Sequence, residues 1–107
     1  QVLVLIFVLV SMGIKSSFAA ETITVPSQNF EAELNNAIER ANGSTIIVLP
    51  AGRFSMENEL IVDRPGITLL GQGMKETVLS FKRQKAGPQG IIATKDQITF
   101  QDFTVED

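Results

Sequence analysis

Residues 44–81 read STIIVLPAGRFSMENELIVDRPGITLLGQGMKETVLSF, and this stretch decides the fold. It consists of short apolar runs separated by turns in which glycine and proline recur. The runs leave no room for a crossover helix, which excludes a doubly wound α/β sheet. They are also too short and too closely spaced for a conventional β-sandwich. The stretch therefore predicts an all-β solenoid built from short strands.

The short runs recur in a fixed order, as successive coils of a solenoid require. We expect strands at residues 45–49, 53–56, 60–63, 67–70, 77–81, 90–94, 98–100 and 103–105. With three strands to a coil, the inward positions of the first strands would be Ile47 and Leu49, matched with Ile67 and Leu69 and then with Ile98 and Phe100. The second strands would contribute Phe54, residues 78–81, Phe103 and Val105. The third would match Leu60 and Val62 with Ile91 and Ala93.

Successive first strands then start about 20 and 31 residues apart, and the longer step contains the polar insertion 82–89. This spacing predicts two coils and the start of a third. We expect Gly71 and Gly73 to be turn glycines with positive φ between two strands, because a strand follows them at once and the third glycine of a dinucleotide-binding loop is replaced by Glu76.

An amphipathic helix precedes the solenoid stretch. Residues 21–25 alternate as a short strand, and helical spacing then relates Phe30, Leu34, Ala37, Ile38 and Ala41. Asn29 is the expected N-cap, and Asn42 with Gly43 marks the expected stop. The single apolar stripe must lie on something, and the open end of the first coil, with its unpaired strand edges, is the surface that needs covering.

The chain resembles the N-terminal end of right-handed parallel β-helix proteins of the pectin-lyase-like superfamily, in particular bacterial exported parallel β-helix repeat proteins. The resemblance covers residues 30–107 and is strongest in IIVLPAG (46–52) and GITLLGQG (66–73) followed by TVL (77–79). It implies a right-handed parallel β-helix with an N-terminal capping helix, incomplete at the C-terminus. The expected divisions are a signal peptide (1–19), the first strand and capping helix (20–43) and the coils (44–107).

Residues 2–14 form an apolar run that is too short for the roughly 20 residues of a membrane-spanning helix but has the length of a signal-peptide core. Ser17 and Ala19 are the small residues expected at a peptidase site that cuts after Ala19. The segment starts at Gln1 without Met or a basic region, so we expect its N-terminus to be truncated, and the alternative to a signal peptide is an uncleaved anchor whose upstream half is missing. We expect an exported protein, periplasmic or secreted, with no membrane attachment after cleavage.

Charge and composition exclude several function classes. The net charge is −3, and without Lys15 the count is 8 basic against 12 acidic residues, or −4. This balance argues against nucleic-acid binding, which needs a basic face. The chain has no Cys or His, so these residues alone form no thiolate or imidazole metal site and no Ser-His-Asp triad. The lack of Trp and Tyr weakens any sugar-stacking platform.

Two groups of charged residues are candidate site residues. Lys82, Arg83 and Lys85 form a basic cluster on the insertion, from which they could contact an acidic polysaccharide, although ordinary solvation is the competing interpretation. The carboxylates on or beside expected strands are Asp63, Asp102, Glu106 and Asp107. Asp102 and Glu106 could share an outward face, with a solvated charged face as the competing interpretation. The superfamily's lyases hold calcium with acidic residues on coil faces, but no such full set is present here.

The resemblance implies an exported β-helix scaffold whose full-length form binds or processes polysaccharide, as a lyase, hydrolase or epimerase-like enzyme if it is catalytic. Related enzymes carry their active residues on central coils, which would follow Asp107, so we expect no catalytic residue and no cofactor within residues 1–107. Calcium stays open for a full-length form. A non-enzymatic structural or adhesive cell-surface solenoid, and a binding module without catalysis, are the alternatives, because fold does not determine function.

Overall fold

The computed structural model describes residues 20–84 and 90–106. Within these ranges the chain is mostly strand, with one short helix. The elements are β1 (Glu21–Thr24), α2 (Phe30–Arg40), β2 (Thr45–Val48), β3 (Gly52–Ser55), β4 (Leu60–Val62), β5 (Ile67–Leu70), β6 (Thr77–Ser80), β7 (Ile91–Ala93), β8 (Thr99–Gln101) and β9 (Thr104–Glu106). The expected signal peptide with its cleavage site at Ala19, and residues Lys85 and Asp107, lie outside the described ranges.

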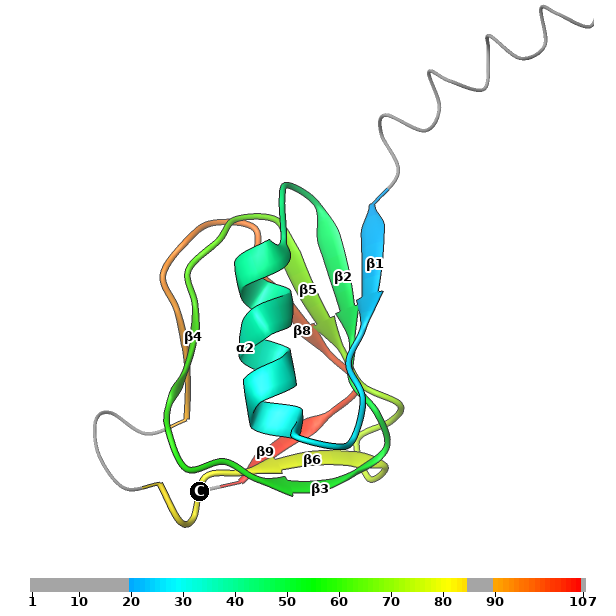
Figure 1. Ribbon diagram of the computed structural model, residues 1–107, viewed down its shortest axis with the longest axis vertical. Coiled ribbons are helices and arrows are strands. Elements are labelled where there is room, and N and C mark those ends of the chain that lie inside the picture. The colour runs from blue at the N-terminus through cyan, green and yellow to red at the C-terminus, as the bar shows by residue number, and fades with distance from the viewer. Residues whose placement is uncertain (1–19, 85–89, 107) are drawn as a thin grey trace, which may run out of the picture.

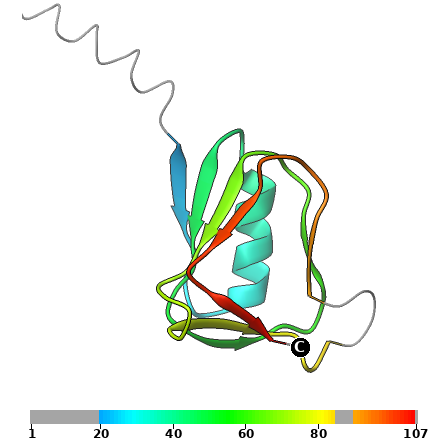
Figure 2. The same cartoon turned by 180° about the vertical axis from the view of Figure 1, so that it is seen from behind.

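The strands form three parallel sheets, and the chain visits these sheets in the same order each time. The sheets are β1-β2-β5-β8, β3-β6-β9 and β4-β7. In the view of Figure 1 the three sheets form three sides of the molecule, with α2 in front of the space between them, and Figure 2 shows the same arrangement from behind. From β2 on, the strands recur in the predicted order: β2 pairs with β5 and β5 with β8, β3 pairs with β6 and β6 with β9, and β4 pairs with β7, all in parallel.

The register of the third strands is as predicted, and so is that between β5 and β8, where Leu69 pairs with Phe100, whereas the register between β2 and β5 differs from the prediction. Leu60 pairs with Ile91 and Val62 with Ala93. In the first sheet, Ile47 pairs with Leu69 instead of Ile67, and Ile67 pairs with Thr45. The reason is that Thr45 is itself buried, and its hydroxyl donates a hydrogen bond to the carbonyl of Gly43. The residues of β2 that point inward thus begin with a polar residue. Paired residues of β2 and β5 are 22 positions apart in the sequence (67 − 45) instead of about 20.

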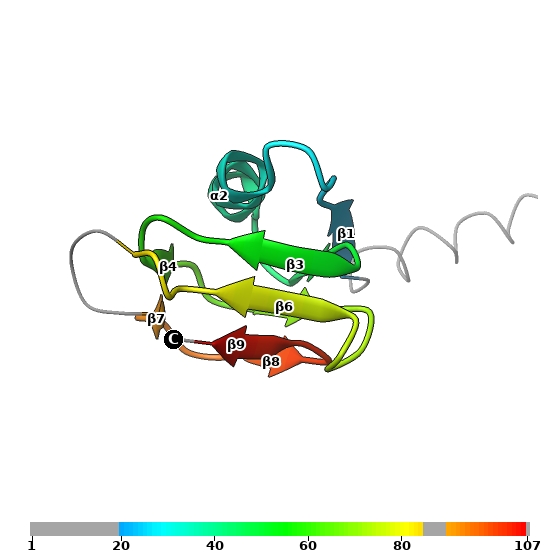
Figure 3. The same ribbon diagram turned by 90° about the horizontal axis from the view of Figure 1, so that it is seen from below.

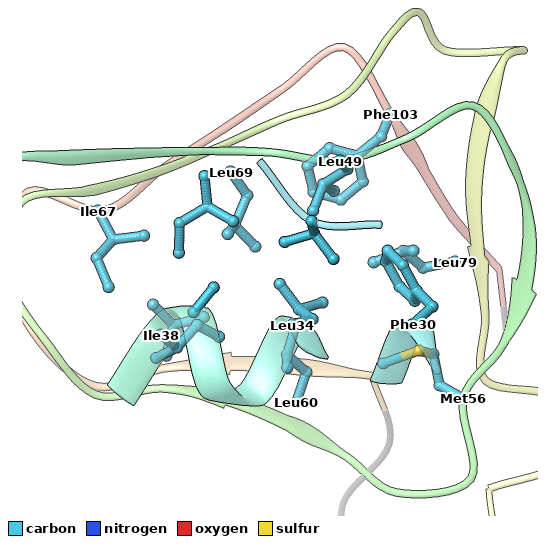
Figure 4. Packing of buried hydrophobic residues seen from close by; sticks show 14 of the residues in the cluster. Phe30, Leu34, Ile38, Leu49, Met56, Leu60, Ile67, Leu69, Leu79 and Phe103 are labelled. Atoms are coloured by element: carbon cyan, nitrogen blue, oxygen red, sulfur yellow. The ribbon is translucent and has the colours of Figure 1, made fainter. Parts of the chain in front are cut away.

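The core lies between the sheets and the helix (Figure 4). Phe30, Leu34, Ala37 and Ile38 of α2 are buried, which confirms the predicted apolar stripe. The strands contribute residues that are fully buried, including Ile47, Leu49, Leu60, Val62, Ile67, Leu69 and Leu79. Each such aliphatic side chain contributes about 1.5–3 kcal/mol through burial. No helix in the described part of the chain is long and apolar enough to cross a membrane.

The helix begins where it was predicted to begin, but by a different mechanism. Asn29 occupies the N-cap position with a left-handed backbone (φ 54°), and its side chain makes no capping hydrogen bond. Its carbonyl accepts the hydrogen bond from the backbone N–H of Glu33. At the other end the helix stops at Arg40, because Ala41 is already extended (φ −63°, ψ 135°). The Asn29 side chain therefore does not stabilise the helix start in the way that the sequence predicted.

Position 71 requires a glycine because neighbouring atoms lie close to its Cα atom, and not because its φ angle is positive. Its backbone is not left-handed, in contrast to that of Gly73 (φ 149°). A Cβ atom at Gly71 would lie 2.7 Å from Cβ of Phe103 and would also collide with the backbone carbonyl of Asp102. Gly71 is thus an inward position of the first sheet, against which the next corner of the chain packs. The prediction of a positive φ is confirmed for Gly73 and wrong for Gly71.

The last strand of each sheet exposes apolar side chains at positions that are buried one layer earlier. Phe100 pairs with Leu69, and Val105 pairs with Leu79. Leu69 and Leu79 are fully buried, whereas Phe100 is 45% and Val105 44% exposed. Figure 3 shows why: α2 and β1 lie at one end of the stack, and β8 and β9 lie at the other. Phe100 therefore occupies the predicted inward position opposite Leu69 but is only partly buried there.

Candidate functional site

The outward side of the β3-β6-β9 sheet collects polar and charged side chains from three strands. Phe54, Leu79 and Val105 are paired neighbours in this sheet, and Leu79 is fully buried, so this row faces inward. Because side chains alternate along a strand, the residues on either side of that row face outward. We call the resulting surface the outer face, and it comprises the polar or charged residues Arg53, Ser55, Ser80, Thr104 and Glu106 together with the apolar Val78; Ser80 is itself buried.

A salt bridge crosses the outer face from β3 to β9. The guanidinium of Arg53 donates two hydrogen bonds to the carboxylate of Glu106, one of them from Nη1 to Oε2 at 3.0 Å and the other from Nη2 to Oε1. The two residues lie on strands that flank β6, so the Arg53 side chain must extend over β6 to reach its partner. Arginine suits this geometry because its planar fork matches both oxygens of a carboxylate.

Lys82 adds a second cation to the same carboxylate. It follows β6 and the buried Phe81, and its Nζ lies 3.9 Å from Oε1 of Glu106. The side chains of Arg53 and Lys82 are 57% and 58% exposed, while that of Glu106 is 29% exposed. We call Arg53, Lys82 and Glu106 the charge trio. Two cations facing one carboxylate leave a net positive charge at this point of an otherwise acidic chain.

The surroundings of Glu106 hold it in the ionised form. Hydrogen bonding from Arg53 is the largest influence and lowers the pKa of Glu106 below 4.5. Partial burial acts in the opposite direction, while the charges of Arg53 and Lys82 and a hydrogen bond from Ser80 lower the pKa further. Glu106 is therefore a carboxylate at neutral pH, and both cations keep their partner there.

The structure divides the predicted basic cluster and adds a residue to it. Lys82 joins the charge trio, Arg83 is exposed beside it, and Lys85 lies outside the described residues. Arg53 was not among the candidates, because an isolated arginine in an alternating strand has the pattern of any solvated strand face. The available signal was its alternation with Phe54, which predicts that Arg53 points outward from a sheet whose inner side is apolar.

The predicted carboxylates do not form one acidic site. Asp102 lies at the corner between β8 and β9 with a left-handed backbone (φ 60°), and its carbonyl accepts a hydrogen bond from the N–H of Gly73. Glu106 instead contacts Arg53 and Lys82, and Asp107 lies outside the described residues. Within residues 20–84 and 90–106, no three His, Cys, Asp or Glu side chains are grouped to hold a metal ion.

Asp63 lies in a separate hollow between α2 and β4. This half-open hollow has a volume of about 530 Å³ and is lined by Asn35, Ile38, Glu39, Ile61, Asp63 and Arg64. Its charges are mixed, since two carboxylates and one guanidinium contribute to the lining. The hollow does not include any member of the charge trio.

A second, shallower hollow adjoins the charge trio through Arg53. Its volume is about 450 Å³, and its lining comprises Ser27, Asn29, Phe30, Glu31, Ala32, Arg53, Phe54 and Ser55. The rings of Phe30 and Phe54 stack on one another here, with centroids 4.0 Å apart. Arg53 thus stands between this hollow and Glu106. A bound molecule that contacted Arg53 would have polar groups and an aromatic edge within reach.

Comparisons with protein-family models, with curated proteins and with solved structures found no match to this chain.

Proposed function

We propose that this chain folds as an exported, right-handed parallel β-helix. The support is the path of the chain, which passes through three parallel sheets in a repeated order with each strand stacked on its equivalent. A connection between parallel strands of one sheet is right-handed in nearly all proteins, which favours that hand. The helix α2 would cap the first coil, because its apolar stripe is buried at one end of the stack.

Export is supported by the apolar run at residues 2–14 and by the small residues Ser17 and Ala19. The test is N-terminal sequencing of the protein recovered from the periplasm or the culture medium. We expect the first residue to be Ala20. A mature protein that begins upstream of Ser17, or one that stays in the cytoplasm, would contradict export by a cleaved signal.

We propose that the outer face of the β3-β6-β9 sheet binds acidic polysaccharide. The observation that carries the proposal is the convergence of Arg53 and Lys82 on a single carboxylate. The carboxylate of a uronate residue has the same shape and charge as that of Glu106, so the guanidinium fork and the ammonium that hold Glu106 suit it equally well. Because Arg53 and Lys82 already converge on one carboxylate, one anionic group of a polymer can contact both cations.

The experiment is a binding titration of the chain with polygalacturonate or alginate, with neutral dextran as the control polymer. We expect the double variant Arg53→Ala/Lys82→Ala to bind the acidic polymers about tenfold more weakly, because it removes two charge-assisted contacts. The matched control is Arg64→Ala/Lys95→Ala, which removes the same charge after β4 and after β7. Binding should weaken with rising salt. Equal affinities of the two double variants, or equal binding of dextran, would reject the proposal.

A further inference from the structure

We infer that Glu106 is a built-in competitor of the acidic ligand, so that binding at the charge trio is an exchange of one carboxylate for another. This inference rests on the proposed function, because it concerns the same site. Glu106 holds both Nη atoms of Arg53 and lies 3.9 Å from the ammonium of Lys82. A ligand carboxylate that engaged Arg53 through the same two nitrogens would have to displace Glu106.

The contacts around Glu106 allow such an exchange. Arg53 is more than half exposed, so its guanidinium can rotate away from β9 towards the hollow beside Phe54 and Ser55, which it also lines. The separation of 3.9 Å between Lys82 and Glu106 is longer than a hydrogen bond, so Lys82 loses an ion pair but no hydrogen bond when Glu106 is displaced. Glu106 would keep its contact with Ser80. The exchange therefore needs side-chain rotation and leaves the strands in place.

The competitor also determines which ligands the site can select. A neutral sugar cannot replace the charge of Glu106. Arg53 and Lys82 would therefore stay paired with Glu106 and would not bind the sugar. A single isolated carboxylate gains little, because it only substitutes for a carboxylate that is already present at high effective concentration. A polymer presents several carboxylates to Arg53 and Lys82, so that a neighbouring carboxylate can bind when one dissociates. The structure thus points to a preference for polyanionic glycans over their monomers.

The groups that face Glu106 are Arg53 from β3, Ser80 from β6 and Lys82 after β6, and they make the competition dependent on pH. Protonation of Glu106 at acid pH would release both cations. Dextran sulfate is the suitable probe, because its sulfate groups stay ionised where carboxylates become protonated. Wild-type binding should strengthen on acidification by more than that of Glu106→Gln, which cannot lose a charge at this position.

The decisive experiment compares Glu106→Gln with Glu39→Gln in a titration with polygalacturonate at about 0.1 M salt, where charges more than about 10 Å apart are largely screened. Both variants remove one carboxylate, but Glu39 lines the hollow between α2 and β4. We expect Glu106→Gln to bind about two- to fivefold more tightly than wild type, as the loss of an exposed ion-pair competitor allows. We expect Glu39→Gln to change affinity by much less.

The outcomes separate this inference from the function on which it rests. Equal affinities of Glu106→Gln and Glu39→Gln would reject the competitor role of Glu106. If Arg53→Ala/Lys82→Ala bound weakly in the same experiment, the proposed anion-binding site would still be supported. Wild-type affinity of Arg53→Ala/Lys82→Ala would reject both. Circular dichroism of each variant shows whether the fold is retained, and Arg53→Lys, which keeps the charge but loses the fork, provides a second variant at the same position. We expect Arg53→Lys to bind between wild type and Arg53→Ala.

Discussion

Glu31 joins α2 to the turn between β3 and β4, and its removal should destabilise the fold more than removal of its neighbour Glu33. The carboxylate of Glu31 accepts hydrogen bonds from the backbone N–H groups of Glu57 and Asn58, each at 3.0 Å, and from the side-chain amide of Asn58 at 3.3 Å. Both partners lie in the turn between β3 and β4, next to the start of α2 (Figure 1). Glu33 shares the first helical turn but takes no part in this contact.

The expected magnitude follows from the kind and the exposure of these bonds. A hydrogen bond to a charged acceptor contributes about 1.5–3 kcal/mol when it is shielded from water. These three are exposed, so water can replace part of each interaction. We therefore expect Glu31→Ala to lower the free energy of unfolding by about 1–2 kcal/mol in total. Glu33→Ala should lower it by about 0.3–0.5 kcal/mol, through the weaker interaction with the helix dipole.

The assay is urea denaturation of the two variants and of wild type, followed by circular dichroism. The slope of the free energy against urea should stay constant, because the exposed surface on unfolding does not change. A difference of about 1 kcal/mol between the variants corresponds to roughly 4–8 °C in melting temperature for a domain of this size. If Glu31→Ala and Glu33→Ala were destabilised equally within 0.3 kcal/mol or so, the contact would be too weak to fasten the helix.

Three further changes test the packing and the electrostatics by the same denaturation assay. Leu34→Ala should cost about 2–5 kcal/mol, because Leu34 is fully buried and its truncation leaves a cavity under the helix; a cost below 1 kcal/mol or so would mean that the helix does not cover the core. Gly71→Ala should cost about 1–3 kcal/mol, because the new Cβ would collide with the corner at Asp102 and Phe103; unchanged stability would contradict the close approach. The pKa of Glu106 is lowered, so its contribution to stability is fully present above pH 4.5 and is lost as the pH falls through the lower folded-state pKa. Glu106→Gln should therefore reduce the acid destabilisation below pH 4.5, and an unaltered pH profile would show that the charge trio does not stabilise the fold.

The helix and most strands could be predicted because their signals are local. The spacing of Leu34 and Ile38 specifies a helix face, and alternation over Leu60 and Val62 specifies a strand face. The register between β2 and β5 depends instead on which residue of β2 is the first to point into the core. That residue is Thr45, and a threonine at that place looks like a boundary residue until its buried hydroxyl is seen to bond to the Gly43 carbonyl. Hydrophobic pattern alone therefore aligned the wrong residues, two positions away from the observed register.

The same limit applied to the helix start and to the turn at residues 71–73. Asn29 has the residue type of a side-chain cap, but its left-handed backbone makes the carbonyl the useful acceptor instead. Gly71 has the residue type of a turn with positive φ, but its requirement comes from Phe103, which packs against it from the next layer. In both cases the residue type was compatible with two mechanisms. The choice between them was made by tertiary contacts, which a single strand or turn does not contain.

The charge trio could be predicted only in separate parts, because its members come from three layers of the stack. Lys82 and Glu106 each belonged to a candidate group, one basic and one acidic, and nothing in their local sequence joined them. Arg53 precedes Glu106 by 53 residues and reaches it only because β3 and β9 flank β6 in one sheet. The register in which β3, β6 and β9 pair therefore determines which outward side chains meet and form the site. A shift of two residues, like the error in the first sheet, would move Glu106 along β9 by two positions and out of reach of the guanidinium that holds it.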